Sequence, residues 1–295
     1  MTVTTILIRP PICLNPSKFN GGFSKPLLKS TFFSSRASFQ CRCIKHEGTP
    51  KGPEAEGFSV LESHTPCDVG SIWSSMGFYV FSIHVPLSFG GLSVAAKVLH
   101  QTVLDPHIQA FLILAIQTME LSIVLLLFKC PGKPHHSLLD FFHVNKASEE
   151  RCWLLGSLLG FGFLVSLVFI TSIVADRLIG PKDVNNPFLK EILLTGSSST
   201  MACILVYCIV TPLLEEVVYR GFLLTSLAST MKWHRSVAIS SLVFSAAHFS
   251  GENFLQLFII GFVLGCTYCW TGNLSSSILT HSLYNALTLF LTFIS

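Results

Sequence analysis

Charged side chains are scarce in this sequence of 295 residues. Only 12% of the residues are Asp, Glu, Lys or Arg, whereas 50% are hydrophobic. Soluble domains carry about 25% charged residues, so the shortage excludes an ordinary water-exposed surface and indicates a polytopic membrane protein. The net charge of +3 is too small to suggest nucleic acid as a partner. We therefore expect the lipid bilayer, and no nucleic acid, around this chain.

Acidic residues are missing from the N-terminus, where Ser, Thr, Lys and Arg are abundant and the first carboxylate is Glu47. No apolar run follows a basic start, which excludes a secretory signal. A basic, Ser-rich and acid-free composition is typical of organellar transit peptides. It predicts a plastid transit peptide over residues 1–50, a polar linker over 51–70 and a chloroplast or other plastid membrane as the location. The alternative is a disordered cytosolic tail.

The ten cysteines lack the spacing of a disulfide framework or of a soluble zinc site. Cys266 and Cys269 do form a C-x-x-C, but they lie within an apolar run. We interpret them as small hydrophobic residues, because buried free cysteines behave as such.

Several long apolar stretches are candidates for membrane-spanning helices, which need about 20 mostly apolar residues. They are residues 71–99, 107–128, 152–175, 197–229, 235–249, 254–270 and 273–294, the fifth being short. The sequence thus predicts an all-α fold, a polytopic transmembrane helical bundle of about seven spans. We divide it into N-terminal transmembrane helices over 71–189 and a second bundle over 190–295, which contains the polar motifs.

Glu215, Glu216 and Arg220 are charged residues inside the apolar stretch 197–229, which Thr211-Pro212 can bend. Charges at membrane depth are costly, rare and usually functional. Glu216 and Arg220 are four residues apart and can pair on one helical face. Glu215 is rotated away from Arg220 and needs another cationic or hydrogen-bonding neighbour to stay ionised. The spacing therefore predicts one structural and one chemically available glutamate, unless both carboxylates share the arginine in a purely structural knot.

Two later apolar stretches add further polar side chains. His248 follows Phe244 by one helical turn, and His281 and Asn285 are four residues apart. Each alone is commonly a buried core group or a hydrogen bond between helices. Together, a carboxylate, an imidazole and a pair of donors are what water-mediated attack on a carbonyl requires.

These motifs, in this order, resemble those of the CPBP family of intramembrane proteases, also called Abi, which includes the type II CaaX prenyl endopeptidases. They are E-E-x-x-x-R in "EEVVYR", F-x-x-x-H in "FSAAH" and H-x-x-x-N in "HSLYN", with "GFVLG" and "TGNL" between the last two. The resemblance covers roughly residues 190–294. It implies that residues 190–295 are a CPBP/CaaX protease-like catalytic bundle that hydrolyses peptide bonds of membrane-associated proteins or peptides.

The resemblance also implies roles for the individual residues. Glu215 and His248 would activate the hydrolytic water, and His281 and Asn285 would stabilise the oxyanion. Glu216 and Arg220 would shape the site. We expect no cofactor, although the older description of the family as metalloproteases leaves a zinc alternative. In that alternative Glu215, His248 and His281 are the ligands, although no H-E-x-x-H motif is present.

Two other functions remain open from the sequence. One is a non-catalytic membrane scaffold or chaperone of the same family, which would keep the pair Glu216–Arg220 and tolerate loss of Glu215. The other is a proton-coupled transporter that uses Glu120, Glu215 and His248 as a relay. A transporter would distribute its charges over more spans than this sequence does.

Overall fold

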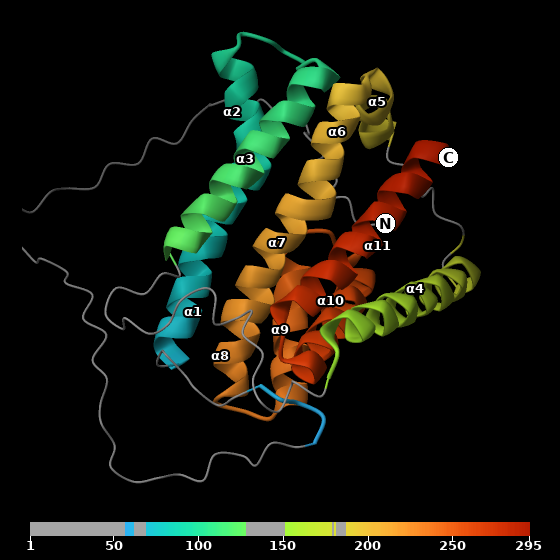
Figure 1. Cartoon of the computed structure of the whole chain (residues 1–295). Coiled ribbons are helices and arrows are strands. Elements are labelled where there is room, and N and C mark those ends of the chain that lie inside the picture. The colour runs from blue at the N-terminus through green and yellow to red at the C-terminus, as the bar shows by residue number, and fades with distance from the viewer. Residues whose placement is uncertain (1–56, 62–68, 128–150, 179, 181–186) are drawn as a thin grey trace, which may run out of the picture. The chain divides into compact units, whose positions relative to one another are not determined.

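The computed structural model describes residues 57–61, 69–127, 151–178, 180 and 187–295, which belong to one compact unit (Figure 1). Every regular element within these ranges is a helix, which confirms the all-α prediction. The transit peptide expected over 1–50 lies outside the described residues. Of the linker expected over 51–70, residues 57–61 are described, and there Val60 N donates to the Cys269 carbonyl at 3.0 Å.

The N-terminal part of the described chain forms three long helices. The first is continuous but changes type along its length. Its segments are α1 (Val69–Phe78), the π-helical η1 (Tyr79–His84) and η2 (Pro86–Gly90), and α2 (Gly91–Val98). The other two are α3 (Pro106–Leu127) and α4 (Trp153–Leu178).

The second bundle begins with a short helix and continues with a long one that carries the charged motif. Its helices are α5 (Pro187–Thr195), the continuous run α6 (Ser197–Leu205), η4 (Val206–Val210), α7 (Thr211–Glu216), η5 (Val217–Leu224) and α8 (Thr225–Ala228), then α9 (Trp233–Ala247), α10 (Phe254–Thr271) and α11 (Leu274–Ile294). At Thr211-Pro212 the helix continues instead of breaking. Proline lacks an N–H and removes a helical hydrogen bond. The wider turns of η4 directly before it accommodate that loss, because Thr211 N already bonds to Val206 O in the i→i+5 pattern.

Six helical stretches of the described chain are long and apolar enough to cross a membrane, so the chain is a multi-pass membrane protein. They are Gly70–Val98, Pro106–Leu127, Trp153–Leu178, Ser197–Ala228, Phe254–Thr271 and Leu274–Ile294. The sequence suggested about seven. The difference is the fifth stretch, which forms α9 with 15 residues. That length is short of the roughly 20 residues a spanning helix needs.

Two glycines let α9 and α10 approach closely. A Cβ on Gly261 would lie 3.2 Å from the Ser241 Cα, and one on Gly265 would lie 3.0 Å from Val237 Cγ1. Small residues four apart on a helix permit such contacts between transmembrane helices. This close contact positions the end of α9 in the bundle, and with it His248.

The turn between α10 and α11 fixes the start of the last helix. Gly272 has a φ of 65°, in the left-handed region where glycine is favoured, and ends α10. Asn273 then caps α11, because its side-chain oxygen accepts from Ser275 N at 2.8 Å. The register of His281 and Asn285 in the bundle follows from this turn.

Candidate active site

Glu216 and Arg220 form a buried ion pair within one helix. Arg220 Nη1 donates to Glu216 Oε1 at 2.8 Å, and the two side chains are 1% and 0% exposed. Arg220 Nη2 donates to the Gly261 carbonyl at 3.0 Å, and its guanidinium lies 4.6 Å from the centre of the Phe244 ring. The pairing is the one that the four-residue spacing predicts. Arg220 thereby ties its own helix to α10 and to α9.

His281 is the second partner of Glu216. Its Nδ1 lies 3.0 Å from Glu216 Oε1, the oxygen that Arg220 also contacts. A carboxylate held by an arginine is an acceptor only, so Nδ1 is the donor in this bond. Its other nitrogen, Nε2, is then directed at Glu215, with 3.7 Å between Nε2 and Oε2. Glu216 therefore orients His281 toward the neighbouring glutamate.

Glu215 lies between two imidazoles. Its Oε1 is 3.6 Å from His248 Nε2, and its Oε2 is 3.7 Å from His281 Nε2. Both distances are too long for a direct hydrogen bond. Glu215 keeps 9% of its surface exposed, whereas Glu216 is fully buried. The two adjacent glutamates therefore have different neighbours and different exposure, as their spacing predicts.

The tautomer of neutral His248 follows from its backbone contact. Nδ1 lies 2.7 Å from the Phe244 carbonyl oxygen, which can only accept. Nδ1 is therefore protonated, and in the neutral ring Nε2 carries the lone pair that faces Glu215. A hydrogen-bond acceptor and a carboxylate oxygen 3.6 Å apart can receive the two protons of one water molecule.

Asn285 contacts the backbone of the long helix. Its Nδ2 donates to the backbone carbonyl of Tyr207 at 2.8 Å. That carbonyl lies five residues before Pro212, which has no N–H to offer it in the π-helical pattern of η4. Asn285 therefore satisfies a backbone acceptor that the proline leaves open. The second N–H of its amide is available for other contacts.

A polar cluster in the N-terminal helices was not recognised in the sequence. Glu120, fully buried on α3, accepts on Oε1 from Tyr79 Oη at 2.9 Å, and His84 Nδ1 lies 2.8 Å from the same oxygen. Ser88 Oγ is 3.4 Å from Glu120 Oε2. Sequence reasoning singled out Glu120 but missed its partners. The available signal was His84, the histidine inside the first apolar run.

The metal alternative gains no support from the donor geometry. Within the described ranges, no group of three or more His, Cys, Asp or Glu side chains is arranged to hold a metal ion. Glu215, His248 and His281 do face one another, but they are not arranged as such a group. We therefore derive no step through a metal.

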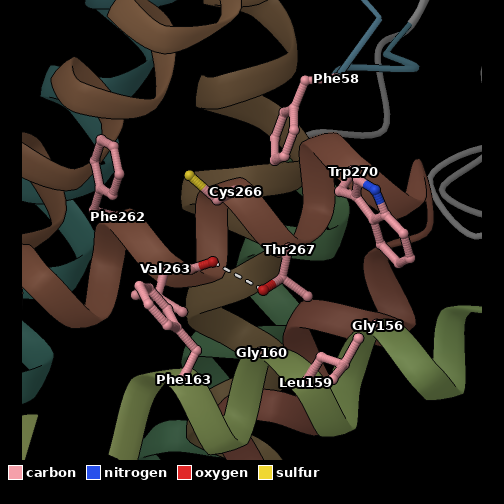
Figure 2. A pocket seen from close by; sticks show the side chains of 10 residues that line it. All are labelled: Phe58, Gly156, Leu159, Gly160, Phe163, Phe262, Val263, Cys266, Thr267 and Trp270. Carbon is pink, nitrogen blue, oxygen red and sulfur yellow. Dashed lines mark hydrogen bonds between the residues drawn. The ribbon is translucent and has the colours of Figure 1, made fainter. Parts of the chain in front are cut away.

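An apolar groove lies between α4 and α10, and no residue with a predicted catalytic role lines it. Figure 2 shows its lining residues, Phe58, Gly156, Leu159, Gly160, Phe163, Phe262, Val263, Cys266, Thr267 and Trp270. Thr267 Oγ1 donates to the Val263 carbonyl of its own helix at 2.9 Å, so its hydroxyl is already satisfied (Figure 2). Cys266 belongs to this apolar lining, and Cys269 is fully buried. Both are free thiols, as expected of hydrophobic cysteines.

Comparison with known proteins agrees with the motifs. Residues 197–287 match the family described as type II CAAX prenyl endopeptidase Rce1-like. The membrane-embedded CAAX protease MroQ of Staphylococcus aureus (strain USA300) is 30% identical over 135 residues, which are 44% of this chain and 54% of that protein. The chain thus spans about half the length of this curated relative. No solved structure matches significantly.

The matched segment contains every residue of the three motifs, from Glu215 to Asn285, in a polytopic helical bundle. Residues 197–287 are thus similar to the Rce1-like type II CAAX prenyl endopeptidases, which supports the resemblance to the CPBP (Abi) family.

Proposed function

We propose that this protein is an intramembrane endopeptidase that hydrolyses peptide bonds of membrane-associated proteins or peptides. The observation that carries the proposal is the position of Glu215, which is 9% exposed and is flanked at 3.6 Å and 3.7 Å by the Nε2 atoms of His248 and His281. The adjacent Glu216 is engaged with Arg220 and His281. One carboxylate is thus free for proton transfer, and the other holds the site together.

In the proposed reaction, a water molecule donates one hydrogen bond to Glu215 Oε1 and one to the lone pair of His248 Nε2. Its oxygen attacks the carbonyl carbon of the substrate peptide bond, and Glu215 accepts the proton. General-base catalysis of this kind contributes about 10²–10⁴ in rate. The carbonyl oxygen becomes an oxyanion, which needs donors placed before the reaction.

His281 is suited to stabilise that oxyanion. Glu216 accepts from its Nδ1 and so orients the ring with Nε2 directed at the reacting atoms, where it would donate to the oxyanion. The second N–H of Asn285 is the other proposed donor. When the intermediate collapses, the C–N bond breaks, and the proton held by Glu215 passes to the leaving nitrogen. This collapse gives a carboxylic acid and an amine, and Glu215 is again ionised. The acid's proton, which is the second proton of the water, then passes to the amine, so that the products leave as a carboxylate and an ammonium group.

The similar protein MroQ is described as a CAAX protease, but a plastid is not expected to contain prenylated CaaX proteins. We therefore propose membrane-associated plastid proteins or peptides as substrates. The location itself is a proposal that rests on the basic, acid-free N-terminus. Mass spectrometry of the mature protein should find a new N-terminus near residues 40–55. A mature chain that starts at Met1 or Thr2 would contradict import by a cleaved transit peptide.

The function is tested by comparing membranes that contain wild-type protein with membranes that contain Glu215→Gln. Quantitative mass spectrometry of protein termini should find new termini that depend on Glu215. The control is Glu191→Gln, which makes the same chemical change on an exposed glutamate of α5. Identical terminal peptides in wild type and Glu215→Gln, at equal protein abundance, would leave the scaffold as the better explanation.

A further inference from the structure

The cluster around Glu120 depends on the π-helical form of η1. Tyr79 and His84 are five residues apart, and in an α-helix they would point about 140° away from each other. In the i→i+5 pattern of a π-helix they share one side. Both therefore reach Glu120 Oε1, at 2.9 Å and 2.8 Å. Local π-helical turns of this kind frequently mark functional sites.

A carboxylate as deeply buried as Glu120 is costly unless it is paired and hydrogen-bonded. Tyr79 and His84 provide these partners from a neighbouring helix, and Ser88 adds a longer contact. Packing between helices alone would not require a buried charge. The buried charge of Glu120 therefore needs a further explanation, and the surroundings of His84 provide one.

His84 lies beside the proposed catalytic residues. Its ring lies close to the backbone of Ala247, the residue before His248, and it is near enough to interact electrostatically with Glu215 and with His248. The residue after His248 is held from the same helix, because Phe89 of η2 packs edge-on against Phe249 with ring centres 5.3 Å apart. Phe249 has a φ of 49°, a left-handed conformation that a bulky residue seldom adopts without support.

We propose that His84, held by Glu120 and Tyr79, is a positioning residue of the Glu215 site. It fixes the end of α9 so that His248 Nε2 faces Glu215. The inference rests on the proposed endopeptidase function of Glu215. Residues 79–120 lie outside the segment that matches the family model, so in this proposal the N-terminal helices contribute to the site as well.

The test uses the full-length protein in liposomes and a peptide substrate found through the Glu215-dependent termini. His84→Asn shortens the side chain and removes the imidazole that lies close to the Ala247 backbone. Displacement of a catalytic group by about 1 Å can cost on the order of 10²-fold in rate. We expect kcat per folded molecule to fall roughly 10- to 100-fold, with KM close to that of wild type. The thermal midpoint should fall as well, because the buried Glu120 loses a partner.

The matched control is His107→Asn on α3. His107 Nε2 also bonds to another helix, at 2.8 Å from Ser198 Oγ. Ser198 is 17 residues before Glu215 in one continuous helical run, roughly 20–25 Å away by helical rise. We expect its kcat to be unchanged. Equal effects of the two substitutions would mean that His84 only joins helices, which would overturn the inference.

If His84→Asn does not fold, a more conservative substitution tests the same role. Tyr79→Phe removes only the hydroxyl that donates to Glu120, and leaves the ring in place. It should lower kcat by a smaller factor without changing KM. Unchanged kcat in this variant, with Glu215-dependent turnover intact, would refute the positioning role alone. A wild-type protein without Glu215-dependent hydrolysis would overturn the proposed function and this inference with it.

Discussion

Oε1 of Glu216 accepts from Arg220 Nη1 at 2.8 Å and from His281 Nδ1 at 3.0 Å. One oxygen thereby joins the motif of the long helix to the motif of α11. Because the carboxylate is fully buried, neither bond competes with water. The consequence is that Glu216 determines both the fold of the bundle and the direction in which His281 points.

The two adjacent glutamates should therefore respond differently to the same substitution. Glu215→Gln keeps size and hydrogen bonding but cannot accept a proton, so the protein should accumulate normally and lose about 10²–10⁴ in turnover. Glu216→Gln leaves Arg220 without its charged partner, and breaking a buried ion pair costs roughly 3–5 kcal/mol. Its thermal midpoint and abundance should fall. The measurement is specific activity per folded molecule, with a thermal melt of each variant.

One outcome would contradict this division of roles. If both variants lose stability equally and Glu215→Gln keeps its specific activity, both carboxylates have a structural role only. The scaffold function would then replace the protease.

Gly261 is predicted to be intolerant of a larger side chain. A Cβ there would lie 3.1 Å from Phe244 Cδ1 and 3.2 Å from the Ser241 backbone, so Gly261→Val must push α9 and α10 apart. Overpacking costs about 1–3 kcal/mol, and it also displaces the carbonyl that accepts from Arg220. A thermal melt in detergent should show the loss. Gly162→Val on α4 is the control, because a Cβ there meets nothing within 4 Å and should leave the midpoint nearly unchanged.

Activity should be insensitive to removal of divalent metal ions. Both histidines next to Glu215 have Nδ1 bonded within the protein, and the proposed reaction needs only their Nε2 atoms and the carboxylate. Turnover should be the same before and after dialysis against EDTA, and elemental analysis should find no stoichiometric zinc. Loss of proteolysis that added zinc restores would instead make Glu215, His248 and His281 metal ligands.

The main groups of the site could be predicted because they stand out from an apolar background. Helical spacing was enough to pair Glu216 with Arg220 and to separate Glu215 from them, since α7 and η5 remain helical throughout. The number of spans was harder to predict. A hydrophobic run such as α9 has the composition of a spanning helix, but it has only 15 residues, and seven of them are buried in the bundle.

The contacts that depend on π-helical turns could not be predicted from spacing. Tyr79 and His84 are five residues apart, so a pattern search at three or four residues does not group them. The transporter alternative had placed Glu120 with Glu215 and His248. The structure does bring Glu120 toward that site, through His84, but no regular spacing in the sequence indicates this arrangement.

Substitutions at Asn285 can distinguish a structural role of this side chain from a catalytic one. Asn285→Leu should leave the Tyr207 carbonyl without a donor, which costs about 1–3 kcal/mol. Adding Pro212→Ala supplies a backbone N–H for the freed carbonyls, so the double variant should recover most of the lost stability in a thermal melt. If Asn285 also donates to the oxyanion, kcat should stay about 10²–10³ below wild type in the double variant. Full recovery of both quantities would show that Asn285 only compensates for the proline.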